Sequence, residues 1–198
     1  MVKFTKEISY YFSKPGKQNT TDTINFALDV AKTQKIKNIV VASSSGESAL
    51  KIAKAAKRAQ FNLIVVSTSP ASKKHAEWLK NKLKLEKLGV KTLTSTSPFA
   101  GIARSINARW GGVNPGLLTA DTLRTFSEGT KVGIEIMLMV TDAGLIEPDS
   151  KTITIAGTGA GLDTAMVVKS TFSFKFFELA INKIICKPIT DGVKHSAR

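Results

Sequence analysis

Two hydrophobic patterns alternate along most of this chain and indicate alternating strands and helices. Continuous apolar runs rich in β-branched residues, at 38–42 and 63–66, are typical of strands buried on both faces of a parallel sheet. Between them, apolar residues recur at helical spacing and predict a helix over about 47–59. A strand–helix–strand unit of this kind implies a right-handed parallel crossover.

The remaining segments extend this alternation to both ends of the chain. We predict further strands at 8–12, 90–94, 152–156, 164–168 and 181–186, a helix that begins at Thr20 or Thr21, and helices over about 72–88, 101–110, 117–127 and 131–145, while 172–180 fits neither pattern. Strands that alternate with helices through short loops give a three-layer α/β domain. We therefore expect a single domain over 1–198, with the helical stretch 98–146 as an elaboration of it.

The predicted helix over 72–88 carries a lysine-rich face. Its charged residues recur at steps of three or four, and Ala76, Leu79 and Leu83 lie opposite them. We expect these three residues and Trp78 to face the core, and the charged face to be solvated. The lysines of this face are Lys73, Lys80, Lys84, Lys87 and Lys91.

Composition excludes several classes of site. The 198 residues include one cysteine, Cys186, and two histidines, which excludes an internal disulfide and argues against cysteine- or histidine-based metal sites. The longest apolar stretch, 132–140, is interrupted by Glu135 and is too short to span a bilayer, and the N-terminus lacks an apolar signal core. We therefore expect a cytoplasmic protein with no metal and no membrane partner.

The net charge of +14 raises the question of an anionic macromolecular partner. Of the 29 basic residues, 24 are lysines and only five are arginines, although arginine is the usual residue for recognising bases and phosphates. Non-specific nucleic-acid binding through the lysine-rich face is therefore the least favoured of three functional hypotheses.

A serine-rich turn joins the strand at 38–42 to the helix that follows it. Free backbone N–H groups and the positive end of the helix dipole meet at such a turn, and open α/β sheets bind ligands at the carboxyl ends of their strands. The alternative is an ordinary serine N-cap with Glu47 as a first-turn acid. The residues of this candidate phosphate cradle are Ser43, Ser44, Ser45, Gly46, Glu47 and Ser48.

A glycine-rich segment, 157–161, separates the predicted strands at 152–156 and 164–168. Because a strand follows it rather than a helix, the segment matches the dinucleotide-binding loop poorly. We interpret it as a flexible loop folded over a ligand, with a wide hairpin as the alternative.

A few charged side chains of the helical stretch are further candidates. Glu135 and Asp142 lie seven residues apart on one face of an otherwise apolar helix, where acids are either paired or functional. Lys131 is placed to pair with Glu135. Arg104 and Arg109 lie close together and are a candidate phosphate contact.

Together these motifs resemble the C-terminal α/β domain of pyruvate kinase and, more closely, a group of stand-alone archaeal proteins built on that domain. The serine-rich turn resembles the effector-phosphate loop of that family, and the glycine-rich segment resembles its late glycine loop. The resemblance covers nearly the whole chain and rests on the segments 12–20, 40–49, 104–106, 111–113, 131–136, 142–144, 163–165 and 184–188, together with Gly101.

The resemblance implies a three-layer α/β/α fold with a mixed, mostly parallel sheet. It suggests flavin mononucleotide (FMN) as a ligand, is compatible with a homo-oligomer, and implies no pyruvate kinase activity, because that chemistry resides in a barrel domain for which this chain has no room. We therefore predict one pocket for a phosphate-bearing small molecule, either FMN-like or a sugar phosphate. The alternative is an enzyme acting on such a molecule, with Glu135 or Asp142 as the acid or base. The predicted ligand-binding residues are Asn19, Thr20, Ser43, Ser44, Ser45, Gly46, Glu47, Ser48, Arg104, Gly157, Gly159, Asp163 and Thr164.

Overall fold

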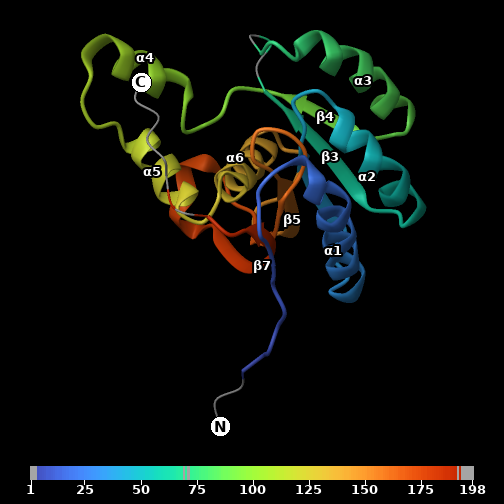
Figure 1. Cartoon of the computed structure of the whole chain (residues 1–198). Coiled ribbons are helices and arrows are strands. Elements are labelled where there is room, and N and C mark those ends of the chain that lie inside the picture. The colour runs from blue at the N-terminus through green and yellow to red at the C-terminus, as the bar shows by residue number, and fades with distance from the viewer. Residues whose placement is uncertain (1–3, 69, 71, 191, 193–198) are drawn as a thin grey trace.

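Seven strands form one mixed sheet in the computed structural model of the chain, which describes residues 4–68, 70, 72–190 and 192 (Figure 1). In spatial order the strands are β1 (Tyr10–Phe12), β7 (Ala180–Pro188), β6 (Thr164–Lys169), β5 (Lys151–Ala156), β2 (Asn38–Ala42), β3 (Asn62–Ser67) and β4 (Lys91–Thr94). The neighbours from β5 to β4 are parallel, β6 is antiparallel to both β5 and β7, and β1 is parallel to β7. The mixed, mostly parallel sheet expected from the sequence is confirmed.

Helices cover both faces of the sheet and give the predicted three layers. One core lies under α1 (Thr20–Thr33), α2 (Glu47–Arg58) and α3 (His75–Lys87). The other lies under α6 (Glu128–Asp142). Alternate residues of a single strand serve the two cores, since Val41 packs with the first and Val40 with the second. This explains why the central strands are apolar throughout.

The helical stretch between β4 and β5 reaches away from the sheet. It contains α4 (Gly101–Trp110) and α5 (Pro115–Arg124), and Figure 1 shows α4 set apart from α1, α2 and α3. Asn114 caps α5, because its side chain accepts a hydrogen bond from the N–H of Gly116. The helix α6 begins at Glu128, three residues before the predicted start, because the side chain of Ser127 accepts from the N–H of Thr130 and caps the helix there.

The inward face predicted for α3 is wrong in part. Trp78 is fully buried as expected, but the predicted core residues Leu79 and Leu83 are 49% and 62% exposed, and Ala76 is exposed as well. The indole N–H of Trp78 donates to Thr94 Oγ1 at 3.0 Å. Trp78 and its hydrogen bond to Thr94 therefore determine which face of α3 packs against the sheet. The predicted apolar residues Ala76, Leu79 and Leu83 do not.

Several other segments also differ from the prediction in their limits. The strand predicted at 8–12 is reduced to β1, and the segment 172–180, which fitted neither pattern, forms a 3-10 helix, η2 (Ser173–Glu178). A second 3-10 helix, η1 (Lys17–Asn19), precedes α1. η1 packs against α1, and η2 packs against α6.

Replacing Trp78 by alanine tests the corrected face of α3. Truncation of a buried tryptophan typically costs about 3–5 kcal/mol in the free energy of unfolding. We expect a loss in that range for Trp78→Ala in urea denaturation, and a change within about 0.5 kcal/mol for Leu83→Ala, because Leu83 faces solvent. Equal losses in the two variants would show that α3 packs through its leucines.

Candidate functional site

A cavity of about 1560 Å³ opens where the parallel strands end. The loops that follow β2, β3, β4 and β5 all contribute to its wall, together with η1, α4, α5 and α6. β2 lies between β3 and β5. The chain therefore continues from β2 to β3 on one side, and β5 is added later on the other side of β2. Such a switch in strand order opens a crevice at the carboxyl ends, which is where open α/β sheets bind ligands.

The serine-rich turn forms one wall of this cavity. Ser43 Oγ accepts from the N–H of Gly46 at 3.1 Å, so this serine closes the turn just before α2 begins at Glu47. The amide of Asn81 on α3 donates to the carbonyl of Ser45 at 2.9 Å. Gly46 has a φ of +86°, and a Cβ on it would lie 2.6 Å from Asn81 Cβ. The turn is thus pressed against α3 and held in one shape at the N-terminus of a twelve-residue helix.

The glycine-rich segment forms the adjacent wall and links β5 to β6 as the hairpin alternative anticipated. Its shape depends on Asp163, which is fully buried. One carboxylate oxygen of Asp163 accepts from the N–H groups of Gly16 and Thr158, at 2.9 and 3.1 Å. Thr20 adds a second link, because its Oγ1 accepts from the N–H of Leu162 at 3.1 Å. The loop is therefore anchored to the segment that precedes α1 and to the first residue of α1.

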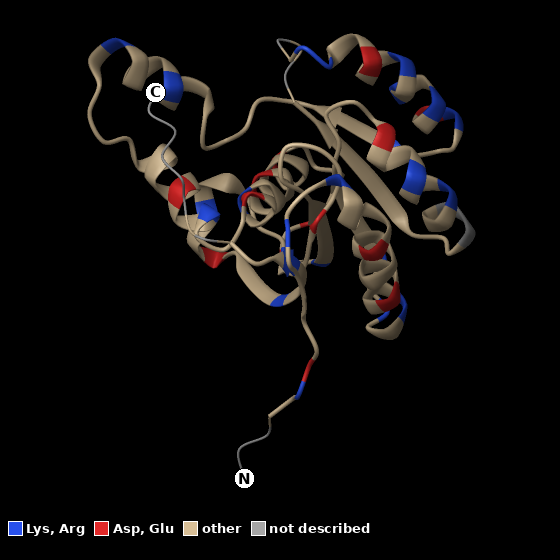
Figure 2. Ribbon diagram, in the orientation of Figure 1, with Lys and Arg blue, Asp and Glu red and all other residues tan. Residues whose placement is uncertain are grey.

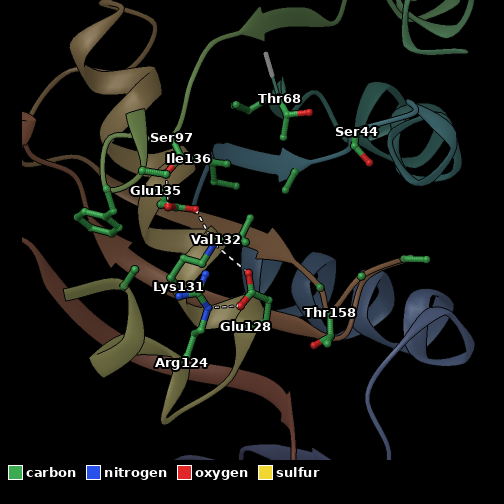
Figure 3. A pocket seen from close by; sticks show the side chains of 18 of the residues that line it. Ser44, Thr68, Ser97, Arg124, Glu128, Lys131, Val132, Glu135, Ile136 and Thr158 are labelled. Atoms are coloured by element: carbon green, nitrogen blue, oxygen red, sulfur yellow. Dashed lines mark hydrogen bonds and ion pairs between the residues drawn. The ribbon is translucent and has the colours of Figure 1, made fainter. Parts of the chain in front are cut away.

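A chain of alternating charges crosses the third wall (Figure 3). Arg124 donates to Asp121 and to Glu128, at 2.6 Å in each case. Lys131 Nζ lies 2.9 Å from Glu128 Oε1 and 3.1 Å from Glu135 Oε2. The chain ends at Ser97, whose hydroxyl donates to Glu135 Oε1. All six residues line the cavity, and Lys131 and Glu135 are buried.

The charges in this chain stabilise one another's ionised forms. Burial opposes ionisation of Glu128, but hydrogen bonds and charge attraction from Lys131 and Arg124 outweigh it and lower the pKa of Glu128. Burial likewise opposes the charge on Arg124, but Glu128 and Asp121 outweigh it and raise the pKa of Arg124. These interactions favour the charged forms of Glu128 and Arg124 within a preorganised wall.

The cavity brings together most of the predicted site residues and leaves out five. Ten of them line it: Thr20, Ser43, Ser44, Ser45, Glu47, Ser48, Arg104, Glu135, Gly157 and Gly159. Gly46, Asn19, Asp163 and Thr164 are not among the lining residues, and the side chains of the last three bond with the protein itself. These four support the walls from behind.

Asp142, the second acid proposed as a catalytic group, points elsewhere. It is exposed at the end of α6, and its Oδ1 accepts from the N–H of Ser173 at 2.8 Å, at the start of η2. Arg109 also lies outside the lining and is stacked on Trp110, with its guanidinium carbon 5.0 Å from the ring centroid. Glu135 and Arg104 are thus the members of those two pairs that reach the cavity.

Sequence reasoning missed several residues of the charged wall. The pairing of Lys131 with Glu135 was expected, but Ser97, Arg124 and Glu128 were not identified. The sequence does indicate a row of ion pairs here, because charged residues recur at steps of three or four from Asp121 to Glu135. Three further lysines that line the cavity, Lys17, Lys51 and Lys74, were not distinguished from the other lysines of the chain.

Other kinds of site find no support in the part of the chain that the structure describes. No group of three or more histidine, cysteine, aspartate or glutamate residues there could hold a metal ion. No helix among the described residues is long and apolar enough to cross a membrane. Burial raises the pKa of the Cys186 thiol to about 12, so it is not a reactive nucleophile.

Replacing Glu128 by glutamine tests the ion chain through its pH dependence. A carboxyl whose pKa is lowered on folding contributes stability above its unfolded pKa, near 4.3, and loses that contribution as the pH falls through the folded value. We therefore expect Glu128→Gln to lower the melting temperature at pH 7 and to match the parent protein below the folded pKa of Glu128. Asp29→Asn, at an exposed position of α1, is the control and should change neither value. A melting difference for Glu128→Gln that does not depend on pH would contradict the assignment.

Three solved structures are remotely similar to this chain. An NH3-dependent NAD synthetase from Campylobacter jejuni is 17% identical, with a TM-score of 0.40 over 71% of this chain and 56% of the synthetase. An NMN synthetase from Francisella tularensis is 14% identical, with a TM-score of 0.40 over 69% of this chain and 52% of that protein. A pyruvate kinase from Cryptosporidium parvum is 17% identical, with a TM-score of 0.38 over 76% of this chain and 22% of the kinase.

These scores are too low to support any argument about function, and this chain spans only about half of either synthetase and under a quarter of the kinase. The family comparison is more informative. A model of the pyruvate kinase alpha/beta domain matches residues 21–168, from the start of α1 almost to the end of β6. That span includes the serine-rich turn, the charged wall and the glycine-rich loop. The chain therefore belongs to the family of the pyruvate kinase alpha/beta domain.

Proposed function

We propose that this protein binds a phosphate-bearing small molecule with a ring system, of the FMN kind, in the cavity at the carboxyl ends of its strands. The observation that carries the proposal is the arrangement of the walls. A serine-rich helix N-terminus and the buried Glu135 both line one cavity, with apolar side chains also in its wall. We do not propose pyruvate kinase activity for these 198 residues.

The phosphate would lie at the serine-rich turn. The N-terminus of α2 offers backbone N–H groups and the positive end of the helix dipole. Two lysines line the cavity near this turn. Lys51 lies one turn into α2, and Lys17 lies in η1, next to Gly161 of the glycine-rich loop. Glu47 repels an anion, so the two lysines are needed to make this region attractive to phosphate.

The ring system would lie against α6 and the loop after β4. Val132, Ile136 and Met139 line the cavity along α6, and Phe99 lines it from the loop that follows β4. Figure 3 shows Val132 and Ile136 between the charged wall and the loops that carry Ser44 and Thr68. A flat apolar ring would cover these side chains, whereas a sugar phosphate would leave them in water. The sugar phosphate is therefore the second choice of ligand.

Catalysis on such a ligand is the alternative function, and Glu135 is the observation that favours it. Glu135 is 5% exposed, lines the cavity and is held by Ser97 and Lys131. A carboxylate fixed in this way can accept a proton from a bound molecule. Asp142 has no part in this alternative, because it contacts η2 instead.

Nucleic-acid binding is not part of the proposal. Figure 2 shows the Lys and Arg positions along α2 and α3, but acidic residues stand among them. On α3, the exposed surface combines lysines with Glu77, Glu86 and two exposed leucines. α3 itself contains no arginine, and its one aromatic residue, Trp78, is fully buried. A surface that binds along a nucleic-acid backbone would carry aromatic residues for base stacking and arginines, whereas this surface carries leucines.

A thermal-shift assay with FMN and sugar phosphates tests the binding proposal. A ligand present at about 100 times its Kd adds about 2.7 kcal/mol to the stability of the folded state. We expect FMN to raise the melting temperature more than a sugar phosphate at the same concentration. Flavin absorbance in the purified protein would support the same conclusion. Failure of every phosphate-bearing ligand to shift melting would refute the proposal.

Two variants on α2 locate the phosphate. Lys51 lines the cavity, whereas Lys54, on the same helix, is exposed and is not among the lining residues. A hydrogen bond to a charged group contributes about 1.5–3 kcal/mol, so Lys51→Glu should weaken FMN binding about tenfold or more in isothermal titration. Lys54→Glu, with the same change in net charge, should bind within about twofold of the parent. Similar losses in both variants would point to bulk charge and not to a site.

Mass analysis of ligands after incubation with the protein tests the enzymatic alternative. If chemistry occurs, Glu135→Gln should abolish conversion of the ligand but retain its binding, because Lys131 keeps Glu128 as a partner. A parent protein that returns FMN and sugar phosphates unchanged would eliminate this alternative for those ligands and leave the binding proposal intact.

A further inference from the structure

A second, smaller cavity lies between α2 and α3, which pack side by side (Figure 1). Its volume is about 410 Å³, and we call it the α2–α3 groove. Three residues at or near the start of α2, Lys17, Glu47 and Lys51, line both the groove and the large cavity. The two cavities therefore meet beside the serine-rich turn.

The groove gathers positive charge from three elements. Lys17 of η1 and Lys51 of α2 line it on one side, and Lys80 and Lys84 line it from α3. Lys80 and Lys84 are four residues apart, and like charges at that spacing on a helix destabilise it. The fold thus holds four lysines around one small cavity although they repel one another.

The carboxylates of the groove do not neutralise these lysines. Glu47 and Glu77 are its acidic residues, so four lysines and two glutamates leave a charge of +2. Within the part of the chain that the structure describes, none of these six residues forms an ion pair, whereas Lys82 of the same helix pairs with Glu86. Lysines that line a cavity in this state attract an anion to it.

A buried side chain connects the groove to the serine-rich turn. Asn81 of α3 lines the groove and is 7% exposed. Its amide N–H donates to the carbonyl of Ser45 at 2.9 Å, and its Oδ1 accepts from Lys84 Nζ at 3.3 Å. One side chain therefore fixes both the turn and a lysine of the groove, so their relative positions are set before any ligand binds.

We propose that the α2–α3 groove binds the second phosphate of a ligand that carries a diphosphate, with the nucleoside attached to that phosphate, as in flavin adenine dinucleotide (FAD). This inference rests on the proposed function, which places the first phosphate at the serine-rich turn. The two phosphates of a diphosphate share an oxygen, so the second must lie close beside the first. Lys17 and Lys51 line both cavities and would contact the diphosphate where the cavities meet.

The size and lining of the groove favour a nucleotide over a single phosphate. Sites for small molecules have volumes of about 300–1,000 Å³, so a groove of about 410 Å³ has room for a nucleoside as well as a phosphate. Leu50 of α2 is half-buried and lines the groove, where it offers an apolar contact to a base. FMN bound as proposed, with its ring against α6, would leave the groove without a ligand.

Isothermal titration with FAD and FMN tests the groove, because FAD contains FMN and adds the second phosphate and nucleoside. We expect the parent protein to bind FAD about tenfold or more tightly than FMN. Lys80→Glu and Lys84→Glu should each weaken FAD binding about tenfold and leave FMN binding within about twofold, because neither lysine lines the large cavity.

Lys87→Glu is the matched control for these variants. Lys87 is an exposed lysine of α3 that lines neither cavity, and its variant has the same change in net charge. It should bind FAD within about twofold of the parent. Equal affinities of the parent for FMN and FAD, equal losses of both ligands in Lys80→Glu and Lys84→Glu, or an equal loss of FAD in Lys87→Glu would overturn the inference.

Inorganic diphosphate separates the groove from the flavin proposal. If neither FMN nor FAD binds, the proposed function fails, and titration with diphosphate and orthophosphate then decides the groove. Diphosphate binding that is about tenfold tighter than orthophosphate binding in the parent, and is lost in the double variant Lys80→Glu/Lys84→Glu, would support a diphosphate site. Equal binding of the two anions, no binding of either, or diphosphate binding unchanged in the double variant would overturn it.

Discussion

The architecture depends on a helix that is buried along nearly its whole length and yet carries charge. The sheet requires an apolar cover on the face opposite α1, α2 and α3, and α6 provides it, with twelve of its residues buried. Gly133 allows the close approach, since a Cβ there would lie 2.7 Å from the methyl carbon of Met166 on β6. Lys131 and Glu135 share this helix, and a buried charge is tolerated only when it is paired. The ion chain is therefore what allows one helix to be both core and cavity wall.

The fold could be predicted from the sequence because its central strands require apolar residues at every position. Val40 and Val41 face opposite cores, so both must be apolar, and a continuous β-branched run indicates a strand buried on both faces. The inward face of α3 could not be predicted in the same way. Its leucines and lysines are interleaved, and the outcome depends on a hydrogen bond from Trp78 to Thr94, a contact between two elements.

The candidate site could be predicted only where a motif can be recognised within a few consecutive residues. The turn at Ser43–Ser48 can be recognised because its position between a strand and a helix already implies its chemistry. The roles of Asp163 and Glu135 depend on which distant segments meet them. Asp163 resembles a ligand-binding residue in sequence, but it holds Gly16 and Thr158 from behind the wall. Ser97 carries no local signal at all and enters the site only because the loop after β4 passes over α6.

The pairing of β1 with β7 has a consequence for the order in which the protein acquires its structure. Tyr10 lies opposite Cys186 in the sheet, and Gly16 bonds to Asp163, so the first strand has no partner until the chain has been made beyond residue 180. Contacts between such distant residues form late, because closing a long loop costs entropy before any contact compensates for it. During synthesis, residues 10–16 would wait while the parallel strands from β2 to β4 assemble at the other side of the sheet. The segment that anchors the glycine-rich loop is thus synthesised well before its partners and is among the last to reach its place.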